Sequence, residues 1–375
     1  MADTQTLRAY LRLTLADGVG AVTFRKLVEA FGGAGRVPVD SPKELMRVDG
    51  VGDVTATAIA TVTAQDVDAE LELAGKFGAT FITLEDEGYP RGLRKLYDAP
   101  PLLYVRGRME EADAIALGVV GSRHCTHYGM EQAERFGQLL GRAGFTVISG
   151  GARGIDAAAH RGALAAGGRT IAVMGCGLCK FYPPENQKLF EQIINEGRGA
   201  VISELPMRTA VLGGNFPTRN RIISGLSLGV LVVEAARRSG SLITAREALD
   251  QGKTVFAVPG RVDSLLSQGA NELIRSGAVL VQDLDDILEH LGEVGAKMAV
   301  EDKPVEAAVQ VALNETERKL VAALGGGPMG LDELVRHTGV DTGKAASAMT
   351  MLVLKGMVSQ QPGNVFARNS RGLTT

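Results

Sequence analysis

The stretch Ile115-Ala-Leu-Gly-Val-Val-Gly-Ser-Arg123 and a second stretch, Phe145-Thr-Val-Ile-Ser-Gly-Gly-Ala-Arg-Gly-Ile-Asp156, decide the fold of this chain. Each is a short apolar run that ends in a turn of glycine and serine, followed by an arginine and a helical pattern. Such a turn points backbone N–H groups and a helix N-terminus at an anion, and the arginine adds positive charge. The two turns therefore predict an anion-binding sheet whose ligand is a dinucleotide, a nucleoside phosphate or a nucleic-acid backbone.

From these turns outward, residues 84–292 alternate short β-branched runs with helical patterns. We expect strands near 116–121, 145–149, 170–174, 200–204, 229–234, 254–258 and 278–281, and an edge strand at 102–105. We expect helices near 128–142, 154–166, 186–196, 217–226, 241–251, 269–276 and 284–291. Strands buried on both faces and separated by helices predict a doubly wound parallel sheet of the Rossmann-like α/β class, which binds ligands at the carboxyl ends of its strands.

Residues 1–83 predict a small helical domain. Gly-Val-Gly occurs at 18–20 and again at 50–52, each time before a helical run. This repeat resembles the helix-hairpin-helix (SAM-like) arrangement, whose tight turns contact DNA phosphates. The alternative is that the glycine turns only join antiparallel helices. Asp49 and Asp53 beside the second turn disfavour a phosphate there, so DNA contact by this domain stays open.

Residues 293–375 divide into a linker of mixed charge at 293–309 and a further domain at 310–375. Asn314 and Glu317 predict a capping box at the start of the first of three helices, and a hairpin follows them. This order resembles a winged helix. The expected recognition helix carries only two basic residues, Lys344 and Lys355, which is little positive charge for binding a duplex. Protein contact or a structural role is therefore an equal alternative for this domain.

Length and composition set the class of protein. The chain has 375 residues, enough for two or three domains. Its net charge of −3 means that nucleic-acid binding must come from a local patch. The three cysteines indicate a reducing compartment. The N-terminus lacks a signal pattern, and no apolar run reaches membrane-spanning length. We therefore expect a cytoplasmic protein without a membrane segment.

The two turns do not fit a dinucleotide site. Ser149 replaces the first glycine of Gly-x-Gly-x-x-Gly, and the following strand ends in Val173-Met-Gly-Cys-Gly177 without an acidic residue for the ribose hydroxyl. We therefore expect no cofactor. We also expect no metal, because no second cysteine pair complements Cys176 and Cys179. A site that recruits Cys125 and a histidine is the remaining alternative.

Catalysis has little support in the sequence. No pair of carboxylates stands out. Asp156 and His160 are one helical turn apart, so they can pair on one face and steady the second turn. We favour the plainer interpretation, in which Asp156 serves the helix N-terminus and His160 is a satisfied histidine. We expect no catalytic residue.

Binding of a polyanion fits the remaining features better. Phe216 precedes a helix in a polar, glycine-rich loop, so we expect it to stack on a base. Pro217 suits the first turn of that helix. Arginines at the strand ends are expected to converge on one rim of the sheet: Arg123, Arg153, Arg219, Arg221, Arg237 and Arg238. A row of phosphate sites suits the backbone of a strand better than one nucleotide.

Several motifs in a fixed order make a family resemblance plain. They are Gly121-Ser-Arg123, Ser149-Gly-Gly-Ala-Arg-Gly-Ile-Asp156 with His160, Tyr182-Pro-Pro-Glu-Asn186, Ser203-Glu-Leu-Pro206, Phe216-Pro-Thr-Arg-Asn-Arg-Ile-Ile-Ser-Gly-Leu-Ser227, Ser239-Gly-Ser-Leu-Ile-Thr-Ala245 and Val255-Phe-Ala-Val-Pro-Gly260. Over essentially its whole length the chain resembles the DNA-processing protein A family (DprA/Smf) of bacterial natural transformation. The resemblance implies a protein without catalytic activity that binds single-stranded DNA, forms a homodimer, protects incoming strands and loads the RecA recombinase on them.

The resemblance also implies which residues bind. Family phosphate contacts correspond to Ser122 and Arg123 and to the glycine turn at 150–151, and the base-stacking aromatic corresponds to Phe216. A lysine that some members carry before that aromatic is glycine here, and we expect Lys180 to supply its charge from another loop. The expected nucleic-acid-binding set is Gly121, Ser122, Arg123, Gly150, Gly151, Arg153, Lys180, Phe216, Arg219, Asn220, Arg221, Arg237, Arg238, Ser239 and Ser241.

A nucleotide-processing enzyme is the alternative from another class. Similar sheets occur in the lysine-decarboxylase-like phosphoribohydrolases, which cleave nucleoside monophosphates and carry Pro-Gly-Gly-x-Gly-Thr-x-x-Glu. At that place this chain has Arg238-Ser-Gly-Ser-Leu-Ile-Thr-Ala-Arg-Glu247. Glu247 matches the acid of that motif, but the proline and the first two glycines are absent. A pure adaptor without DNA binding is a third possibility.

Overall fold

The fold is that of a computed structural model, which describes residues 4–292, 313–354, 357–361 and 365–368. The chain forms two compact units, Met1–Val300 and Glu301–Thr375. The linker expected at 293–309 lies outside the described residues. None of the helices in the described ranges is long and apolar enough to cross a membrane.

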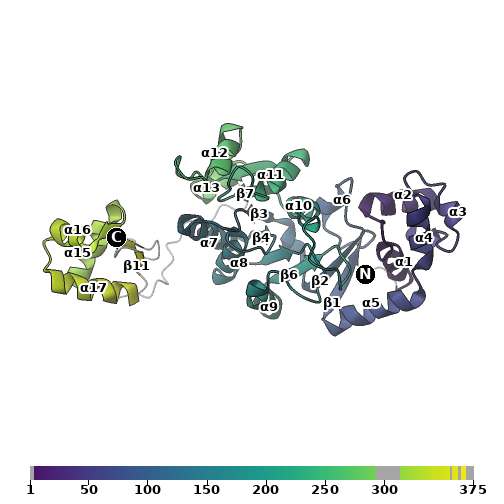
Figure 1. The fold of residues 1–375 in the computed structure, drawn as a ribbon, viewed down its shortest axis with the longest axis horizontal. Coiled ribbons are helices and arrows are strands. Elements are labelled where there is room, and N and C mark those ends of the chain that lie inside the picture. The colour runs from purple at the N-terminus through teal and green to yellow at the C-terminus, as the bar shows by residue number, and fades with distance from the viewer. Residues whose placement is uncertain (1–3, 293–312, 355–356, 362–364, 369–375) are drawn as a thin grey trace. The chain divides into compact units, whose positions relative to one another are not determined.

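The first unit is built on a 9-stranded sheet with the order β1-β2-β6-β5-β4-β3-β7-β8-β9 (Figure 1). The strands are β1 (Ala79–Thr83), β2 (Leu102–Gly107), β3 (Ala116–Val120), β4 (Thr146–Ser149), β5 (Thr170–Val173), β6 (Gly199–Ser203), β7 (Gly229–Val232), β8 (Thr254–Ala257) and β9 (Val279–Leu280). From β6 to β9 in this order neighbouring strands run parallel, and β1 and β2 pair antiparallel. The predicted doubly wound parallel sheet is thus confirmed, with every predicted strand present.

One expectation about the sheet is wrong. β2 is not an edge strand, because β1 pairs with it antiparallel and β6 pairs with its other side. β1 lies within residues 1–83, where a helical domain was predicted. The sheet therefore begins before residue 84, and the helical segment and the sheet belong to the same compact unit.

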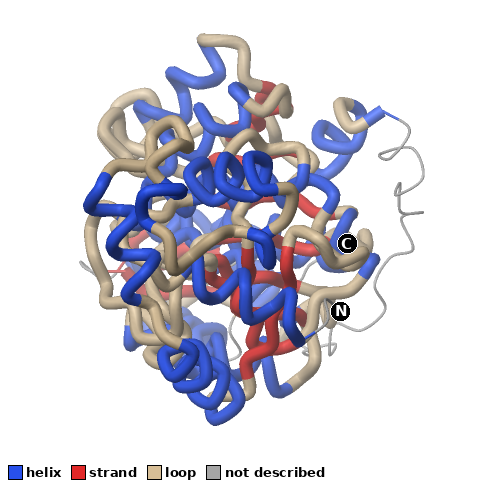
Figure 2. Tube along the Cα trace, turned by 90° about the vertical axis from the view of Figure 1, so that its right-hand side faces the viewer, coloured by secondary structure: helices blue, strands red, loops and turns tan. Residues whose placement is uncertain are grey.

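Helices cover both faces of the parallel sheet (Figure 2). They are α6 (Arg91–Arg94), α7 (His127–Arg142), α8 (Ile155–Ala165), α9 (Gln187–Asn195), α10 (Asn215–Leu226), α11 (Ser241–Asp250), α12 (Gln268–Arg275) and α13 (Leu284–Glu289). Side chains alternate between the faces, as in any strand. Val230 and Val232 of β7 pack in the core of α6, α10, α11 and α12, and Leu231 packs in the core of α7, α8 and α13.

Glycines allow α7 and α8 to pack closely on the second of these faces. A Cβ atom at Gly162 would lie 2.1 Å from the carbonyl oxygen of Glu134, and one at Gly137 would lie 2.3 Å from that of Ala159. Contacts this short are not possible for a real side chain, so the two helices can approach each other only because these positions are glycine.

The helical segment before the sheet contains α1 (Thr4–Thr14), α2 (Ala21–Phe31), α3 (Pro42–Leu45), α4 (Asp53–Thr61) and α5 (Ala64–Lys76). Its two glycine turns are real: Gly18 has φ +82° and Gly50 has φ +85°. Both values favour glycine. The ammonium of Lys26 donates to the carboxylate of Asp49 beside the second turn over 2.8 Å. Glu70 of α5 ties this segment to the loop after β6, because its carboxylate accepts a hydrogen bond from the backbone N–H of Met207 over 2.7 Å.

The second unit contains α15 (Glu315–Ala323), α16 (Leu331–Thr338) and α17 (Thr342–Leu354), and a 3-stranded sheet of β10 (Met329–Gly330), β12 (Val365–Arg368) and β11 (Val358–Gln361). The capping box of Asn314 and Glu317 is confirmed, as is the winged-helix arrangement. Short 3₁₀ turns in the two units lie at Ala34–Arg36, Glu111–Ala114, Pro184–Asn186 and Leu324–Gly326. Lys355 and the hairpin turn at 362–364 lie outside the described residues.

The contact between α7 and α8 leads to a prediction about stability. We expect Gly162→Ala to lower the free energy of unfolding by about 1–3 kcal/mol, because the added methyl group overpacks the helix contact. Gly75→Ala is the matched control, since Gly75 also lies within a helix but has no atom within 4 Å of an added Cβ. There the better helix propensity of alanine should stabilise the protein by up to about 1 kcal/mol. Urea unfolding followed by circular dichroism measures both, and equal stability of the two variants would contradict the close packing.

Candidate nucleic-acid-binding site

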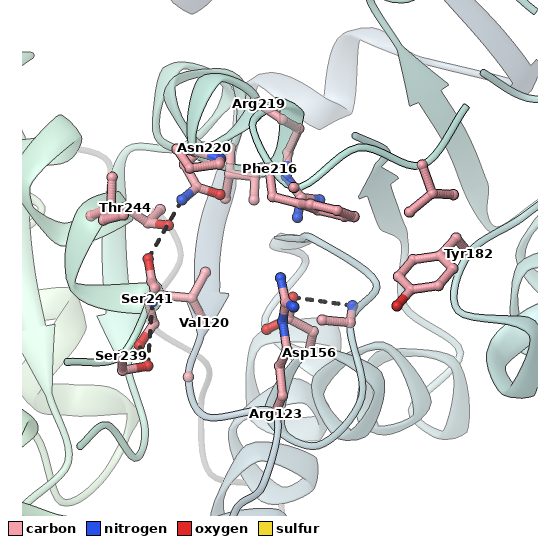
Figure 3. A pocket seen from close by; sticks show the side chains of 18 residues that line it. Val120, Arg123, Asp156, Tyr182, Phe216, Arg219, Asn220, Ser239, Ser241 and Thr244 are labelled. Carbon is pink, nitrogen blue, oxygen red and sulfur yellow. Dashed lines mark hydrogen bonds between the residues drawn. The ribbon is translucent and has the colours of Figure 1, made fainter. Parts of the chain in front are cut away.

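A cavity of about 610 Å³ opens at the carboxyl ends of the parallel strands (Figure 3). It lies where the strand order reverses, since β4 follows on one side of β3 and β7 lies on the other. Ligands of open α/β sheets bind at such a switch point. Five segments line the cavity: the turn after β3, the turn after β4 with the start of α8, the loop after β5 at Tyr182, the loop and first turns of α10, and the start of α11 with the turn before it.

The turn after β3 packs against the segment that follows β7 and against the first residue of α8. Gly121 is required there, because a Cβ would lie 2.8 Å from the carbonyl oxygen of Glu234 and 2.5 Å from Ile155. The N–H of Ser122 donates to the same Glu234 oxygen over 2.7 Å, and its buried hydroxyl donates to the carbonyl of His124 over 2.9 Å. The hydroxyl of Ser122 is thus used within the turn, whereas the side chain of Arg123 is exposed at the cavity.

The Glu234 carboxylate fixes the helix that follows this turn. It accepts from the backbone N–H of Thr126 and from the Thr126 hydroxyl, each over 2.7 Å. Thr126 caps α7, because its hydroxyl accepts from the N–H of Gly129 over 3.1 Å. Glu234 was not among the predicted site residues, because only the fold brings the end of β7 to the start of α7.

The turn after β4 packs on the first turn. Gly151 has φ +64°, and a Cβ there would lie 2.7 Å from the ring of Phe190. Gly154 has φ +74°, and a Cβ there would lie 2.4 Å from the carbonyl oxygen of Ser122. The amide of Asn186 donates to the carbonyl of Gly151 over 2.9 Å. These glycines therefore let the two turns and the loop before α9 approach one another.

Arg219 of α10 reaches the ends of β4 and β5, and its side chain is only 5% exposed. Its guanidinium donates to the carbonyl of Gly150 over 2.7 Å and to the carbonyl of Val173. A side chain at Gly150 would meet this guanidinium at 2.6 Å and the carboxylate of Asp156 at 2.7 Å. Burial lowers the pKa of Arg219 to about 10 and raises the pKa of Asp156. At neutral pH the arginine is therefore still charged, next to an acidic side chain.

An aromatic ring and an arginine face each other at the mouth of the cavity (Figure 3). The guanidinium carbon of Arg123 lies 5.1 Å from the ring centroid of Phe216, and that of Arg219 lies 5.9 Å from it. The ring of Tyr182 is 5.9 Å from the Phe216 ring, centroid to centroid. Phe216 is half-buried, so part of its ring is open to a ligand. Tyr182 was not among the predicted site residues, although it belongs to the quoted motif Tyr182-Pro-Pro-Glu-Asn186.

The expectation that six arginines converge on one rim holds only in part. Arg123 and Arg219 line the cavity. Arg153 lies beside it, over the ring of Tyr182 at 5.9 Å, and pairs with Glu185 at 2.6 Å. Arg237 pairs with Glu272 at 3.6 Å, and Arg238 is exposed without a partner among the described residues.

Arg221 corrects the prediction. Its side chain is buried away from the cavity and pairs with Asp98 at 2.8 Å and with Glu204 at 2.6 Å. The reason is helical geometry, because positions two apart on a helix point to different sides. Arg219 and Arg221 therefore cannot both face the strand ends.

The remaining predicted residues divide in the same way. Asn220, Ser239 and Ser241 line the cavity; the Asn220 amide donates to the carbonyl of Gly240 over 3.5 Å, and the two serine hydroxyls are 2.8 Å apart. Lys180 is exposed and has no partner in the described part of the chain, but it does not line the cavity. Glu247, the acid of the alternative enzyme, also lies outside the lining, in the second half of α11.

His160 does not pair with Asp156, which agrees with the favoured interpretation of an aspartate at the helix N-terminus. Its Nδ1 lies 2.6 Å from the hydroxyl oxygen of Thr170, and that hydroxyl donates to the carbonyl of Val147 over 2.7 Å. The Thr170 oxygen must therefore accept a hydrogen bond from Nδ1–H, which fixes the tautomer. Asp156 instead accepts from the N–H of Ala152 over 3.2 Å. Among the described residues, no three His, Cys, Asp or Glu side chains are placed to hold a metal ion.

Comparison with known proteins agrees with the fold and the motifs. The family described as DNA recombination-mediator protein A matches residues 80–292, and the DprA winged helix domain matches residues 304–364. The protein Smf of Synechocystis is 33% identical over 96% of this chain and 98% of its own length. The protein Smf of Escherichia coli is 47% identical over 56% of each chain.

Two solved structures are also similar. The X-ray structure of DNA processing protein A from Streptococcus pneumoniae has a TM-score of 0.67 and 34% identity, over 75% of this chain and 97% of that chain. DNA processing protein A from Helicobacter pylori, whose structure concerns its single-stranded DNA binding mode, has a TM-score of 0.51 and 30% identity, over 56% of this chain and 95% of that chain.

The buried histidine beneath the second turn predicts a pH dependence of stability. Burial lowers the pKa of His160 to about 3, whereas an unfolded histidine has a pKa of about 6.5. Between these values the unfolded chain binds a proton that the folded chain does not bind, so stability must fall as the pH falls below about 6.5, by up to about 1.4 kcal/mol per pH unit. Above pH 6.5 this contribution is constant.

We expect His160→Asn, which keeps a polar group near Thr170, to reduce this slope in urea unfolding between pH 7.5 and about pH 5. His127→Asn is the matched control, because His127 is an exposed histidine of α7 that pairs with Glu131 at 3.2 Å. It should keep the wild-type slope. An unchanged slope in His160→Asn would show that the folded and unfolded chains bind the His160 proton equally, which contradicts the prediction.

Proposed function

Because the chain belongs to the DNA recombination-mediator protein A family, we propose that its central cavity binds single-stranded DNA without sequence specificity. We propose further that the protein protects the bound strand and loads RecA on it during natural transformation and recombination. In this proposal Phe216 stacks on a base, Arg123 and the glycine turn at 150–151 hold phosphates, and Arg153, Arg238 and Lys180 supply positive charge around the mouth.

The pairing of Arg123 with Phe216 is the observation that carries this proposal. The exposed guanidinium of Arg123 lies over the half-exposed ring of Phe216, 5.1 Å from its centroid. Two glycine turns and two helix N-termini meet at this point. A ring offers a stacking surface to any base, and a guanidinium binds any phosphate. These contacts explain binding that is independent of sequence, since neither reads a base edge.

Helix N-termini add to the attraction for phosphate. α10 and α11 begin at Asn215 and Ser241, and both starts line the cavity. The first N–H groups of a helix have no partner within the helix, and the helix dipole favours an anion there. The Gly213–Gly214 stretch before α10 leaves space for a backbone, because no atom lies within 4 Å of a Cβ at either position.

We propose that the site holds DNA and does not cleave it. Asp156, the carboxyl group of the cavity, accepts backbone N–H bonds and lies next to the guanidinium of Arg219. It therefore serves the turn and is not placed as a free acid or base. Glu247 belongs to a cluster with Asp98, Asp250 and Arg221, so no feature of the cavity favours a phosphoribohydrolase over strand binding.

We propose a homodimer that acts in the cytoplasm, where its DNA and RecA partners are. The edge of the sheet supports the dimer: β9 is the last strand in the order, and Leu280 in it is 43% exposed. Val262 and Leu265, in the loop between β8 and α12, are 92% and 72% exposed. Exposed strand edges with apolar side chains pair with other chains unless they are covered.

Binding by the cavity is tested with Arg123→Ala and Phe216→Ala. We expect Arg123→Ala to weaken binding to oligothymidylate and to reduce the slope of log affinity against log salt by about one. We expect Phe216→Ala to lower affinity by about 1–3 kcal/mol with little change of slope, because stacking releases no counterions. Arg142→Ala is the matched control, since Arg142 is an exposed arginine at the far end of α7. Fluorescence anisotropy at several salt concentrations measures all four proteins, and unchanged affinity of both cavity variants would refute the site.

RecA loading is tested separately from DNA binding. Single-stranded DNA is first coated with single-strand-binding protein, and RecA assembly is followed by its ATP hydrolysis. We expect the full chain to shorten the lag of RecA assembly, and Phe216→Ala to lose this effect because it no longer holds the strand. A wild-type protein that binds the DNA but leaves the lag unchanged would refute loading and leave strand binding intact.

A further inference from the structure

A tyrosine is exposed beside the helical segment, on a surface that the proposed function does not use. Tyr97 follows α6 and is 68% exposed. The guanidinium carbon of Arg25, from α2, lies 5.5 Å from the centroid of its ring. The same guanidinium donates to the backbone carbonyl of Leu96 over 2.8 Å. Arg25 therefore holds the ring in place and leaves most of it open to solvent.

Uncompensated positive charge surrounds this tyrosine. The side chains of Arg91 and Lys95, on and just after α6, are exposed and have no hydrogen-bond or ion-pair partner within the residues that the structure describes. The acidic neighbour Asp98 pairs with Arg221 at 2.8 Å, and Glu204 shares the same guanidinium. An exposed ring among unpaired cations is the composition that binds single-stranded nucleic acid.

This surface is connected to the cavity by one helix. α6 packs against the end of α10, where a Cβ at Gly92 would lie 2.3 Å from the carbonyl oxygen of Gly225. Phe216 stands at the start of the same helix. Figure 1 shows α6 between α10 and the helical segment that contains α2.

We propose that Tyr97 and Arg25 form a second stacking platform for the single strand that leaves the cavity. This inference rests on the proposed function, since it extends the same strand beyond the Phe216 site. The cations Arg91 and Lys95 bind its phosphates, and the ring of Tyr97 stacks on a base beyond the one at Phe216. The platform takes its ring from the loop between α6 and β2 and its guanidinium from the helical segment, so it exists only because the two are docked.

The length of the strand separates the two platforms. An oligothymidylate of about five nucleotides fills the cavity alone, whereas one of about 20 nucleotides reaches both platforms. We expect Tyr97→Ala to weaken binding of the longer strand about tenfold and to leave binding of the shorter strand within about twofold. Tyr97→Phe keeps the ring and should bind both strands as the wild type does.

Tyr128→Ala is the matched control. Tyr128 is 44% exposed on α7, and its hydroxyl donates to the carbonyl of Pro259 over 3.0 Å. It should bind both strands like the wild type. Circular dichroism of each variant of the full chain shows whether it is folded, and the exposure of Tyr97 makes its removal compatible with folding.

Each other outcome has a definite meaning. If Tyr97→Ala binds the longer strand like Tyr128→Ala, or weakens both lengths equally, the second platform is refuted. If it weakens duplex binding more than single-strand binding, the surface serves a duplex and the inference is also wrong. In all these cases loss of binding in Phe216→Ala would leave the proposed function standing. A wild-type protein that binds neither strand would refute the proposed function itself.

Discussion

The buried guanidinium of Arg219 is the interaction on which the rest of the site depends. A charge this far from water costs several kcal/mol unless partners compensate it. The partners are the carbonyls of Gly150 and Val173 and the nearby carboxylate of Asp156. Because these carbonyls end β4 and β5, the arginine ties α10 to two adjacent strands. Phe216 lies one turn earlier on the same helix, so the arginine also fixes where the ring stands.

The same arrangement explains why glycine turns of this kind do not hold a dinucleotide here. In dinucleotide-binding sheets, an acidic residue at the end of the next strand binds the ribose. In this protein that strand end is occupied: a Cβ at Gly175 would lie 3.0 Å from the ring of Phe216. The glycines after β3 and β4 mainly permit close packing, since added side chains would meet Ile155, Ser122 or Phe190. The pattern of glycines therefore indicates close approach, and the side chains that fill the cleft decide the ligand.

Local patterns in the sequence were sufficient for the parallel sheet, because each buried strand and each helix has its own periodicity. They were insufficient wherever a partner comes from far along the chain. β2 was mistaken for an edge strand because its neighbour β1 carries no signal of antiparallel pairing. The sequence could not show that Thr170 is the partner of His160, since only the sheet brings the start of β5 under α8. Clustering of charged residues in the sequence likewise could not show that Arg221 is bound to Asp98, 123 positions away.

The distribution of ion pairs determines where a chain of net charge −3 can attract a polyanion. Arginines paired with carboxylates, such as Arg221 and Arg237, contribute little field at a distance, because each pair is nearly neutral. Arg123 and Arg238 at the strand ends have no carboxylate partner within the described ranges. In the proposed function, the attraction for DNA follows from which arginines the fold leaves unpaired. Net charge and local binding are therefore separate properties of the sequence, and only the second requires the fold.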